Sequence, residues 1–294
     1  SKDMDVPAGD IGVGGREVSY MYAMYKNLTH EYSGVLTGKG VGFGGSLMRT
    51  EATGYGAVYF LENMLKVQNE TMAGKRVLVS GAGNVSLHAA ENACMLGAKV
   101  ITVSDSQGAL YDESGLNQEK IDWLKKQKDQ SKPLKDYVEV FGGEWFAGQK
   151  PWHIKGDIAI PSATQNEVNE DDAKLMVNNG IKYVVEGANM PLTAGAIDYI
   201  RDHRVHYAPG KAANAGGVAV SALEMSQNSV RQYKSFEQID ERLKNIMKNI
   251  HDAAADASEK YHQTDNGYVD YMAGSNIVGF KRVADALCAY GILN

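Results

Sequence analysis

The stretch from Val77 to Asp105 constrains the fold more than any other part of the chain. Its first apolar run, Val77–Val79, ends at the glycine-rich turn Gly81–Ser86. An Ala-rich segment follows, and a second apolar run, Lys99–Val103, ends at Ser104 and Asp105. This order of strand, glycine loop, helix, strand and acid is that of a dinucleotide-binding βαβ unit.

Each position of the turn has a physical reason in this interpretation. Gly81 permits the tight turn, and Gly83 lets backbone N–H groups approach a pyrophosphate at the helix N-terminus. Ser86 stands where a small residue is needed for close packing of helix and strand, and Asp105 can hold the adenosine ribose. The alternative is an ordinary βαβ turn, but the flanking strands and the spaced acid favour cofactor binding.

Composition narrows the class of protein. The 294 residues are 44% hydrophobic and 22% charged, which is typical of a globular protein with one large or two medium domains. A net charge of −6 argues against a nucleic-acid or anionic-membrane surface, and no apolar stretch is long enough to cross a bilayer. Cys94 and Cys288 are too few for a disulfide framework, so we expect a cytoplasmic protein in which both are small core residues.

Three further apolar runs end in small-residue loops that contain an Asn. The runs are Asp157–Pro161, Ile181–Val185 and Val205–Ala208, and they alternate with helical patterns. We therefore predict an α/β fold with a doubly wound parallel sheet of Rossmann type. Because the carboxyl ends of such strands line the ligand cleft, four asparagines would converge there: Asn84, Asn166, Asn189 and Asn214. One loop Asn is usually turn chemistry, but four at equivalent places favour a functional cleft.

Helical periodicity predicts the remaining elements. Residues 16–29 carry an apolar helical face, residues 37–54 form a glycine-rich loop, and helices cover residues 57–66 and 117–128.

The last part of the chain is predicted to be helical as well. Ser235 and Gln238 form a capping box ahead of an apolar stripe from Ile239 to Ile250. A second stripe, also predicted to be core, stops at Gly291 and consists of Ile277, Phe280, Val283, Ala284 and Leu287.

Three side chains outside the βαβ pattern could contact a charged ligand. Asp10 lies on irregular backbone within residues 5–15, where a carboxylate can be aimed at a ligand, although an Asx-turn or helix cap explains it equally well. Arg49 could bind a carboxylate, but a surface loop ahead of a helix is the simpler interpretation. Ser221 lies one turn into a glycine-opened helix, whose N-terminus can support a carboxylate. The His and Cys spacing argues against a metal site, and no G-x-S-x-G motif indicates a serine nucleophile.

Taken in chain order, the motifs resemble those of the glutamate dehydrogenase family, in particular its hexameric bacterial, fungal and protist type. They cover essentially the whole chain and are Asp5–Gly14, Leu36–Lys39, Gly44–Ser46, Arg49–Gly56, Ala163–Asn166, Glu186–Pro191, Asn214–Val218 and Asn276–Phe280. The resemblance implies reversible oxidative deamination of L-glutamate to 2-oxoglutarate and ammonia with a nicotinamide cofactor. It also implies a homo-oligomer, namely a hexamer.

The resemblance implies roles for single residues. Asp10 matches the catalytic aspartate that transfers a proton to and from the substrate nitrogen, and Gly9 is similar to a substrate-contacting backbone position. Ser221 matches the serine that bonds the substrate's side-chain carboxylate, Val218 matches a residue that packs on substrate, and Arg49 resembles a pocket-supporting arginine. The cofactor-binding residues would be Thr53, Gly81, Gly83, Asn84, Val85, Ser104, Asp105, Ala163, Thr164, Asn189 and Asn214.

One departure from the family pattern concerns lysines. The family's catalytic and substrate-binding lysines lie upstream of the aspartate, and Lys2, Lys39 and Lys75 do not sit in that motif. We therefore expect a C-terminal portion of a longer enzyme that is nearly inactive alone. Its expected parts are the remainder of a second, α/β substrate domain (1–52), a dinucleotide-binding domain (53–270) and a C-terminal helix that returns toward the substrate domain (271–294).

The residues alone do not decide whether the cofactor is NAD or NADP, which carries an additional 2′-phosphate. An acid such as Asp105 usually favours NAD, whereas the sequence Ser104–Ser106 resembles NADP-specific members, in which a serine and nearby Lys132 or Lys135 meet the 2′-phosphate. NADP is the expected cofactor and NAD the alternative. Two other functions stay open: a leucine, valine or phenylalanine dehydrogenase, and a non-catalytic dinucleotide-binding module. We expect no metal, nucleic-acid or membrane partner.

Overall fold

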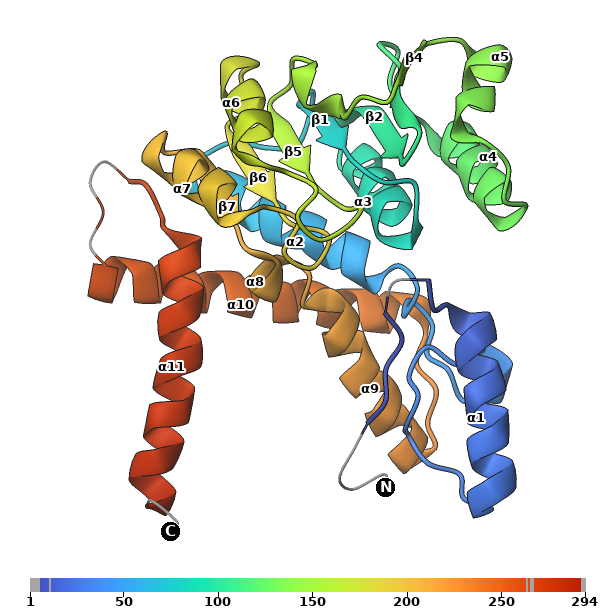
Figure 1. The fold of residues 1–294 in the computed structure, drawn as a ribbon. Helices are drawn as coiled ribbons and strands as arrows, with labels where there is room; N and C mark the ends of the chain where they lie inside the picture. The colour runs from blue at the N-terminus through green and yellow to red at the C-terminus, as the bar shows by residue number, and fades with distance from the viewer. Residues whose placement is uncertain (1–5, 11, 263, 265–266, 292–294) are drawn as a thin grey trace.

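The computed structural model describes residues 6–10, 12–262, 264 and 267–291. Its centre is a seven-stranded sheet with the order β4-β3-β2-β1-β5-β6-β7, and Figure 1 labels all of these strands except β3. The strands are β1 (Arg76–Val79), β2 (Lys99–Asp105), β3 (Gly108–Tyr111), β4 (Glu144–Ala147), β5 (Ile158–Ile160), β6 (Tyr183–Val185) and β7 (His206–Ala208).

Five of these strands form the predicted parallel, doubly wound core of the sheet. β2, β1, β5, β6 and β7 pair in parallel, with Val77 opposite both Val100 and Ile158. The sequence prediction of these five strands is confirmed. The antiparallel strands β3 and β4, which extend the sheet beyond β2, were not predicted.

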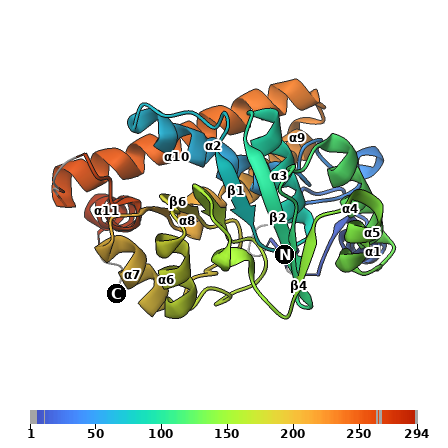
Figure 2. The same ribbon diagram turned by 90° about the horizontal axis from the view of Figure 1, so that it is seen from above.

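Helices cover both faces of the sheet. α2 and α10 lie on one side, and α6 and α7 lie on the other (Figure 2). The α-helices are α1 (Gly15–Thr29), α2 (Ala52–Val67), α3 (Asn84–Met95), α4 (Gln118–Asp129), α5 (Tyr137–Phe141), α6 (Glu170–Asn178), α7 (Ala194–Asp202), α8 (Gly210–Ala213), α9 (Gly216–Val230), α10 (Phe236–His262) and α11 (Tyr271–Tyr290). Short 3₁₀ helices are η1 (Val41–Phe43), η2 (Leu134–Asp136) and η3 (Pro151–His153). Among the residues described, no helix is long and apolar enough to span a membrane.

The alternation of side chains along β1 divides the core into two clusters. Val77 and Val79 pack with buried residues of α2, α3 and α10. Leu78 points to the other face and packs with residues of α6, α7 and η3. Because both faces are covered, the central parallel strands read as continuous apolar runs, which is why the sequence revealed them.

Helix α2 is longer than predicted, and the prediction of a loop through residue 54 is wrong. The helix begins at Ala52, so Gly54 and Gly56 are helical residues. A Cβ added at Gly54 would lie 2.6 Å from the carbonyl oxygen of Val85 in α3, and one at Gly56 would lie 2.9 Å from the Cα of Gly216 in α9. These glycines permit close approach of neighbouring backbones, which outweighs their low helix propensity.

The C-terminal helices agree with the sequence in type but not in burial. The capping box before α10 is present, and Ile239, Leu243 and Met247 are buried as predicted. The second stripe is not core, because Phe280, Val283 and Leu287 are 74%, 62% and 54% exposed.

Helix α11 packs on the body of the protein only at its beginning. Tyr271 and Gly274 are buried there, and the helix then runs past α10 and projects from the body (Figure 1). Its predicted end at Gly291 is confirmed. For the same reason Cys288 is exposed rather than a core residue, whereas the partly buried Cys94 does pack against the core.

The residues before α2 form a small separate cluster. Val18 and Tyr22 of α1 pack against Val35 and Leu36, which confirms the predicted apolar face of residues 16–29. An isolated parallel β-bridge pairs Ala8 with Thr37. Residues 5 and 11 of the Asp10 motif lie outside the described residues.

The packing of α2 on α3 predicts the effect of one methyl group. Replacing Gly54 by Ala should lower the free energy of unfolding by about 1–3 kcal/mol, because the helix backbones must move apart. Gly279→Ala is the matched control, since a Cβ at this helical position meets nothing within 4 Å. That control should be stabilised by about 0.4–1 kcal/mol. Urea denaturation followed by circular dichroism measures both, and equal effects would contradict the packing role of Gly54.

Candidate functional site

Three loops meet at the carboxyl edge of the sheet, where the ligand cleft was predicted. A Cβ added at Gly81, after β1, would lie 2.9 Å from the carbonyl oxygen of Ser162, after β5. A Cβ added at Gly187, after β6, would lie 2.2 Å from the Ser162 hydroxyl and 3.2 Å from the Val85 side chain. Gly81 also has a φ of 83°, in the left-handed region. The loops therefore approach one another at distances that only glycine allows.

The glycine loop leads into α3 in the geometry of an anion-binding helix N-terminus. Gly83 is the N-cap, and a Cβ there would meet nothing within 4 Å, so space lies open in front of the helix. The first N–H groups of a helix have no partner within it and favour an anion. Ser86 is buried, as the packing argument predicts, and donates to the Gly83 carbonyl at 3.0 Å. This arrangement fits the pyrophosphate of a dinucleotide.

The two residues at the end of β2, Ser104 and Asp105, form hydrogen bonds with backbone N–H groups of neighbouring loops. The buried hydroxyl of Ser104 accepts a hydrogen bond from the Gly81 N–H at 3.0 Å and so holds the glycine loop. The exposed carboxylate of Asp105 accepts from the N–H groups of Gln107 and Gly108, at 2.7 and 3.2 Å, in the turn between β2 and β3. Lys132 and Lys135 are exposed in the segment after α4.

The structure brings three of the four predicted asparagines into neighbouring positions. The Asn214 amide donates to the Asn189 side-chain oxygen at 2.8 Å, and the Asn166 N–H donates to the Met190 carbonyl at 3.0 Å. The amide of Asn84 donates instead to the Thr50 carbonyl, just before α2, at 2.6 Å. Ala163 and Thr164 lie in the loop after β5, beside Gly81.

Two carboxylates that the sequence analysis did not select organise these loops. Glu167 accepts from the Ser80 hydroxyl at 2.8 Å and from the Ala163 N–H at 2.9 Å. Glu186 accepts from the Gly210 N–H at 2.6 Å and joins the end of β6 to α8. Burial raises the pKa of both groups above the usual value of 4.5. The sequence signal for both was their place in the strand-following loops, and Glu186 also begins the motif Glu186–Pro191.

The start of α9 lies against the start of α2 and against the loop before it. A Cβ at Gly217 would lie 2.3 Å from the Thr53 hydroxyl. One turn further, the Ser221 hydroxyl accepts from Arg49 Nε at 2.8 Å and from the Thr37 hydroxyl at 2.9 Å. Burial lowers the pKa of Arg49, while the charge of Glu224 acts in the opposite direction. Val218 is 71% exposed beside this group.

The segment that carries Asp10 lies close to the residues around Ser221. The isolated β-bridge between Ala8 and Thr37 places the segment that carries Asp10 beside Thr37, whose hydroxyl contacts Ser221. The Asp10 carbonyl accepts from the Val13 N–H at 2.9 Å, and Gly9 is half-buried against Val13. Asp10 is exposed. The predicted proton-transfer and carboxylate-binding residues therefore lie on adjoining segments.

Two cavities lie away from these residues. One of about 630 Å³ is lined by residues of α7 and the segment before α11, including Arg201 and Asp270, and one of about 360 Å³ is lined by Tyr32 and the end of α9. Within the described part of the chain, no group of three His, Cys, Asp or Glu residues is placed to hold a metal ion.

Comparison with known proteins identifies the family. A family model described as Glutamate/Leucine/Phenylalanine/Valine dehydrogenase matches residues 44–291. The chain belongs to this dehydrogenase family. It is 81% identical, over its full length and 66% of the relative, to the NADP-specific glutamate dehydrogenase of Psychrobacter sp. (strain TAD1). It is 49% identical, over 99% of this chain and 65% of the relative, to the NAD-specific glutamate dehydrogenase of Bacteroides fragilis.

A solved structure agrees with this membership. The crystal structure of Plasmodium falciparum glutamate dehydrogenase superposes with a TM-score of 0.94 at 44% identity, over 98% of this chain and 62% of that chain. This family member therefore spans slightly less than two thirds of the length of the relatives it matches.

The buried carboxylate of Glu186 predicts a pH dependence of stability. Because burial raises its pKa above 4.5 in the folded protein, its stabilising contribution is complete below about pH 4.5 and is lost as the pH rises through the folded pKa. Glu186→Gln removes this titration. The free energy of unfolding of the variant, relative to wild type, should therefore increase from about pH 4.5 to about pH 7.

Urea titrations at a series of pH values measure this difference. Glu241→Gln, at an exposed position on α10, is the control variant. A difference for Glu186→Gln that stays constant across the range would contradict the assignment.

Proposed function

We propose that this chain provides the cofactor-binding region and part of the substrate site of an NADP-dependent glutamate dehydrogenase. The reaction is the reversible oxidative deamination of L-glutamate to 2-oxoglutarate and ammonia. The observation that carries the proposal is the Ser221 hydroxyl, held by Arg49 and Thr37 on a helix that packs against the start of α2. The name of the 81% identical relative supports it.

The chain's residues divide into a cofactor group and a substrate group. NADP(H), when bound, supplies the hydride acceptor or donor. The N-terminus of α3, with Gly81, Gly83, Asn84 and Val85, would hold the pyrophosphate. The other proposed cofactor contacts are Thr53, Ser104, Asp105, Ala163, Thr164, Asn189 and Asn214.

The substrate group would bind both ends of the amino acid. Asp10 would give a proton to, or take one from, the substrate nitrogen, with Gly9 contacting the substrate through its backbone. Ser221 would donate to the distal carboxylate, Arg49 would support that hydroxyl, and Val218 would pack on the substrate. A polar residue at position 221 disfavours the leucine, valine and phenylalanine dehydrogenase alternative, and the residues around Asp10 disfavour a non-catalytic module.

The preference for NADP is part of the proposal. The Asp105 carboxylate is engaged by two N–H groups of its own turn, which weakens the argument that it selects NAD through the ribose. Lys132 or Lys135 would meet the 2′-phosphate. Relatives of both cofactor types match this chain, so the 81% identical NADP-specific relative carries most weight.

The organisation around this site is proposed as well. The division at residues 52/53 and 270/271, a homo-hexameric assembly and a cytoplasmic location follow from the family resemblance. The upstream lysines of the family would complete the site in the full-length protein.

Replacing Asp10 tests the assigned proton transfer. In the full-length protein, Asp10→Asn should lower kcat by about 10²–10⁴-fold, the range of general acid–base catalysis, and leave the Kd for NADPH unchanged. Steady-state rates at 340 nm and NADPH fluorescence measure the two quantities. Asp285→Asn, at an exposed position on α11, is the control. Wild-type turnover in the Asp10 variant would remove Asp10 from the mechanism.

A second measurement tests the cofactor. The Kd for NADPH should be at least about tenfold lower than that for NADH, which corresponds to one favourable charged contact with the 2′-phosphate. The single variants Lys132→Ala and Lys135→Ala identify the contact, because the one that meets the phosphate should weaken NADPH alone. Tighter binding of NADH by the wild-type protein would refute the NADP assignment.

A further inference from the structure

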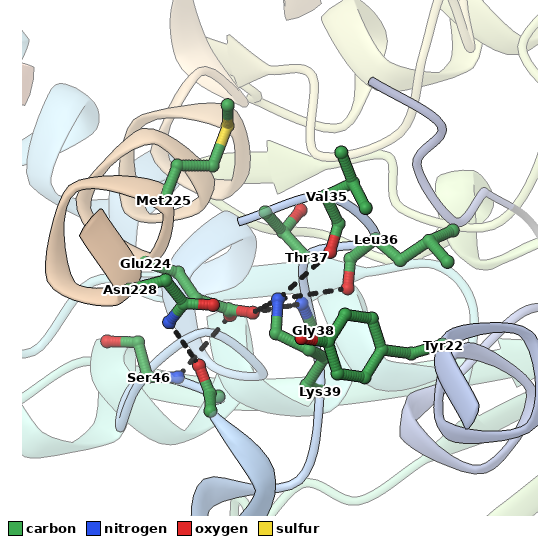
Figure 3. A network of polar contacts seen from close by, with 12 residues as sticks. Tyr22, Val35, Leu36, Thr37, Gly38, Lys39, Ser46, Glu224, Met225 and Asn228 are labelled. Carbon is green, nitrogen blue, oxygen red and sulfur yellow. Dashed lines mark hydrogen bonds and ion pairs between the residues drawn. The ribbon is translucent and has the colours of Figure 1, made fainter. Parts of the chain in front are cut away.

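A fully buried ion pair lies behind the proposed substrate site. The Lys39 ammonium is 2.8 Å from the Glu224 carboxylate, and their side chains are 1% and 0% exposed (Figure 3). Taking two charges out of water is costly, and a buried pair is often no more stabilising than apolar residues of similar volume. Stability alone therefore does not explain the pair.

The pair joins three parts of the structure. Glu224, on α9, also accepts from the N–H groups of Gly38 at 3.0 Å and Ser46 at 3.4 Å. Lys39 donates to the Val35 carbonyl at 3.1 Å and lies 5.1 Å from the ring centre of Tyr22 in α1 (Figure 3). The segment 35–46 is thus bound to both helices through one buried carboxylate and one buried ammonium.

Two amides of α9 strengthen the same attachment. Gln227 donates to the Gly45 carbonyl at 3.1 Å, and Asn228 donates to the Gly44 carbonyl at 2.6 Å. A Cβ at Gly45 would lie 1.8 Å from the Lys39 carbonyl oxygen, so this part of the segment folds back tightly on Lys39. The segment therefore has little freedom to shift along α9.

The segment carries one of the two groups that contact Ser221, and the other follows closely after it. Thr37 directly precedes Gly38, and Arg49 follows Ser46 by three residues. Ser221 precedes Glu224 by three residues, so both side chains lie on one face of α9. A serine hydroxyl has two acceptor sites and one proton. With Arg49 and Thr37 donating to the oxygen, the proton of Ser221 is directed away from them, as a donor to a ligand.

We propose that Lys39 and Glu224 are positioning residues that hold Thr37 and Arg49 against Ser221, and thereby set the selectivity for a substrate with a distal carboxylate. This inference rests on the proposed function. Neither residue contacts the substrate. Together they keep the Ser221 hydroxyl in one orientation, which favours a carboxylate over a methyl group at the end of the substrate.

The test compares two substrates that differ only at this end. The full-length protein is assayed with 2-oxoglutarate and with 2-oxopentanoate, in the presence of ammonium and NADPH. Glu224→Gln keeps the shape of the side chain and removes its charge. We expect the KM for 2-oxoglutarate to rise about tenfold, with kcat and the Kd for NADPH little changed, because one charge-assisted contact loses its geometry. The ratio of kcat/KM for 2-oxoglutarate to that for 2-oxopentanoate should fall by a similar factor.

Asp112→Asn is the matched control for a structural effect. Asp112 forms another largely buried pair, 2.7 Å from Lys120, next to β3 and away from α9. Asp112→Asn should lower Tm without changing the substrate ratio. The double variant Lys39→Met/Glu224→Gln leaves no uncompensated buried charge, so it should fold even where the single variant does not, and should show the same loss of selectivity.

Three outcomes would overturn the proposal. A folded Glu224→Gln or double variant with the wild-type substrate ratio would show that the pair does not position Ser221. Failure of both variants to fold would make the pair a requirement of the fold alone. A wild-type protein that does not turn over 2-oxoglutarate would refute the proposed function and this inference together, which separates that failure from the first two.

Discussion

The relative placement of α3 and α9 depends on the packing of α2 between them. Gly54 of α2 meets the backbone of α3, and Gly56 meets Gly216 of α9, at distances that leave no room for a Cβ. α3 carries the N-terminus that fits a pyrophosphate, and α9 carries Ser221. The spacing between the proposed cofactor and substrate groups is therefore set by backbone contacts through one helix, which do not adjust as side chains do.

The polar groups at the carboxyl edge of the sheet fall into two kinds. Some form hydrogen bonds within the protein: Ser104 accepts from the Gly81 N–H, Glu167 from the Ala163 N–H and Glu186 from the Gly210 N–H. Others keep donors for a ligand, namely the first N–H groups of α3 and the Ser221 hydroxyl. The first kind fixes the loops around the N-terminus of α3, and two of its carboxylates are buried with raised pKa values.

Local patterns predicted the elements that depend on local information. The five parallel strands were predictable because strands covered on both faces are continuous apolar runs. The start of α2 was not, because Gly54 and Gly56 are read locally as loop residues and only the neighbouring backbones explain them. Periodicity showed which face of α11 is apolar, but Phe280 and Val283 are exposed because periodicity does not say what covers a face.

The candidate site was predictable to a similar degree. The meeting of Asn189 with Asn214 follows from parallel topology, since both lie after neighbouring strands. The pairing of Lys39 with Glu224 joins residues far apart in sequence, and neither has a local feature that distinguishes it from a surface charge. The roles of Asp10 and Ser221 came from family resemblance, because their spacing alone suited a turn and a solvated helix position equally well.

The charges behind Ser221 bear on which ligand the site suits. Lys39 and Arg49 contribute two positive charges and Glu224 one negative charge, so the three side chains carry one net positive charge. Burial lowers the pKa of Arg49 because the charged guanidinium is partly removed from water. A distal carboxylate that accepts from Ser221 would bring this group to neutrality, whereas a methyl group would leave the charge unbalanced. In the wild-type protein, electrostatics and the orientation of one hydroxyl thus favour the same class of substrate. Glu224→Gln adds to the positive charge, so a loss of selectivity in that variant reports the orientation of the hydroxyl and not the charge.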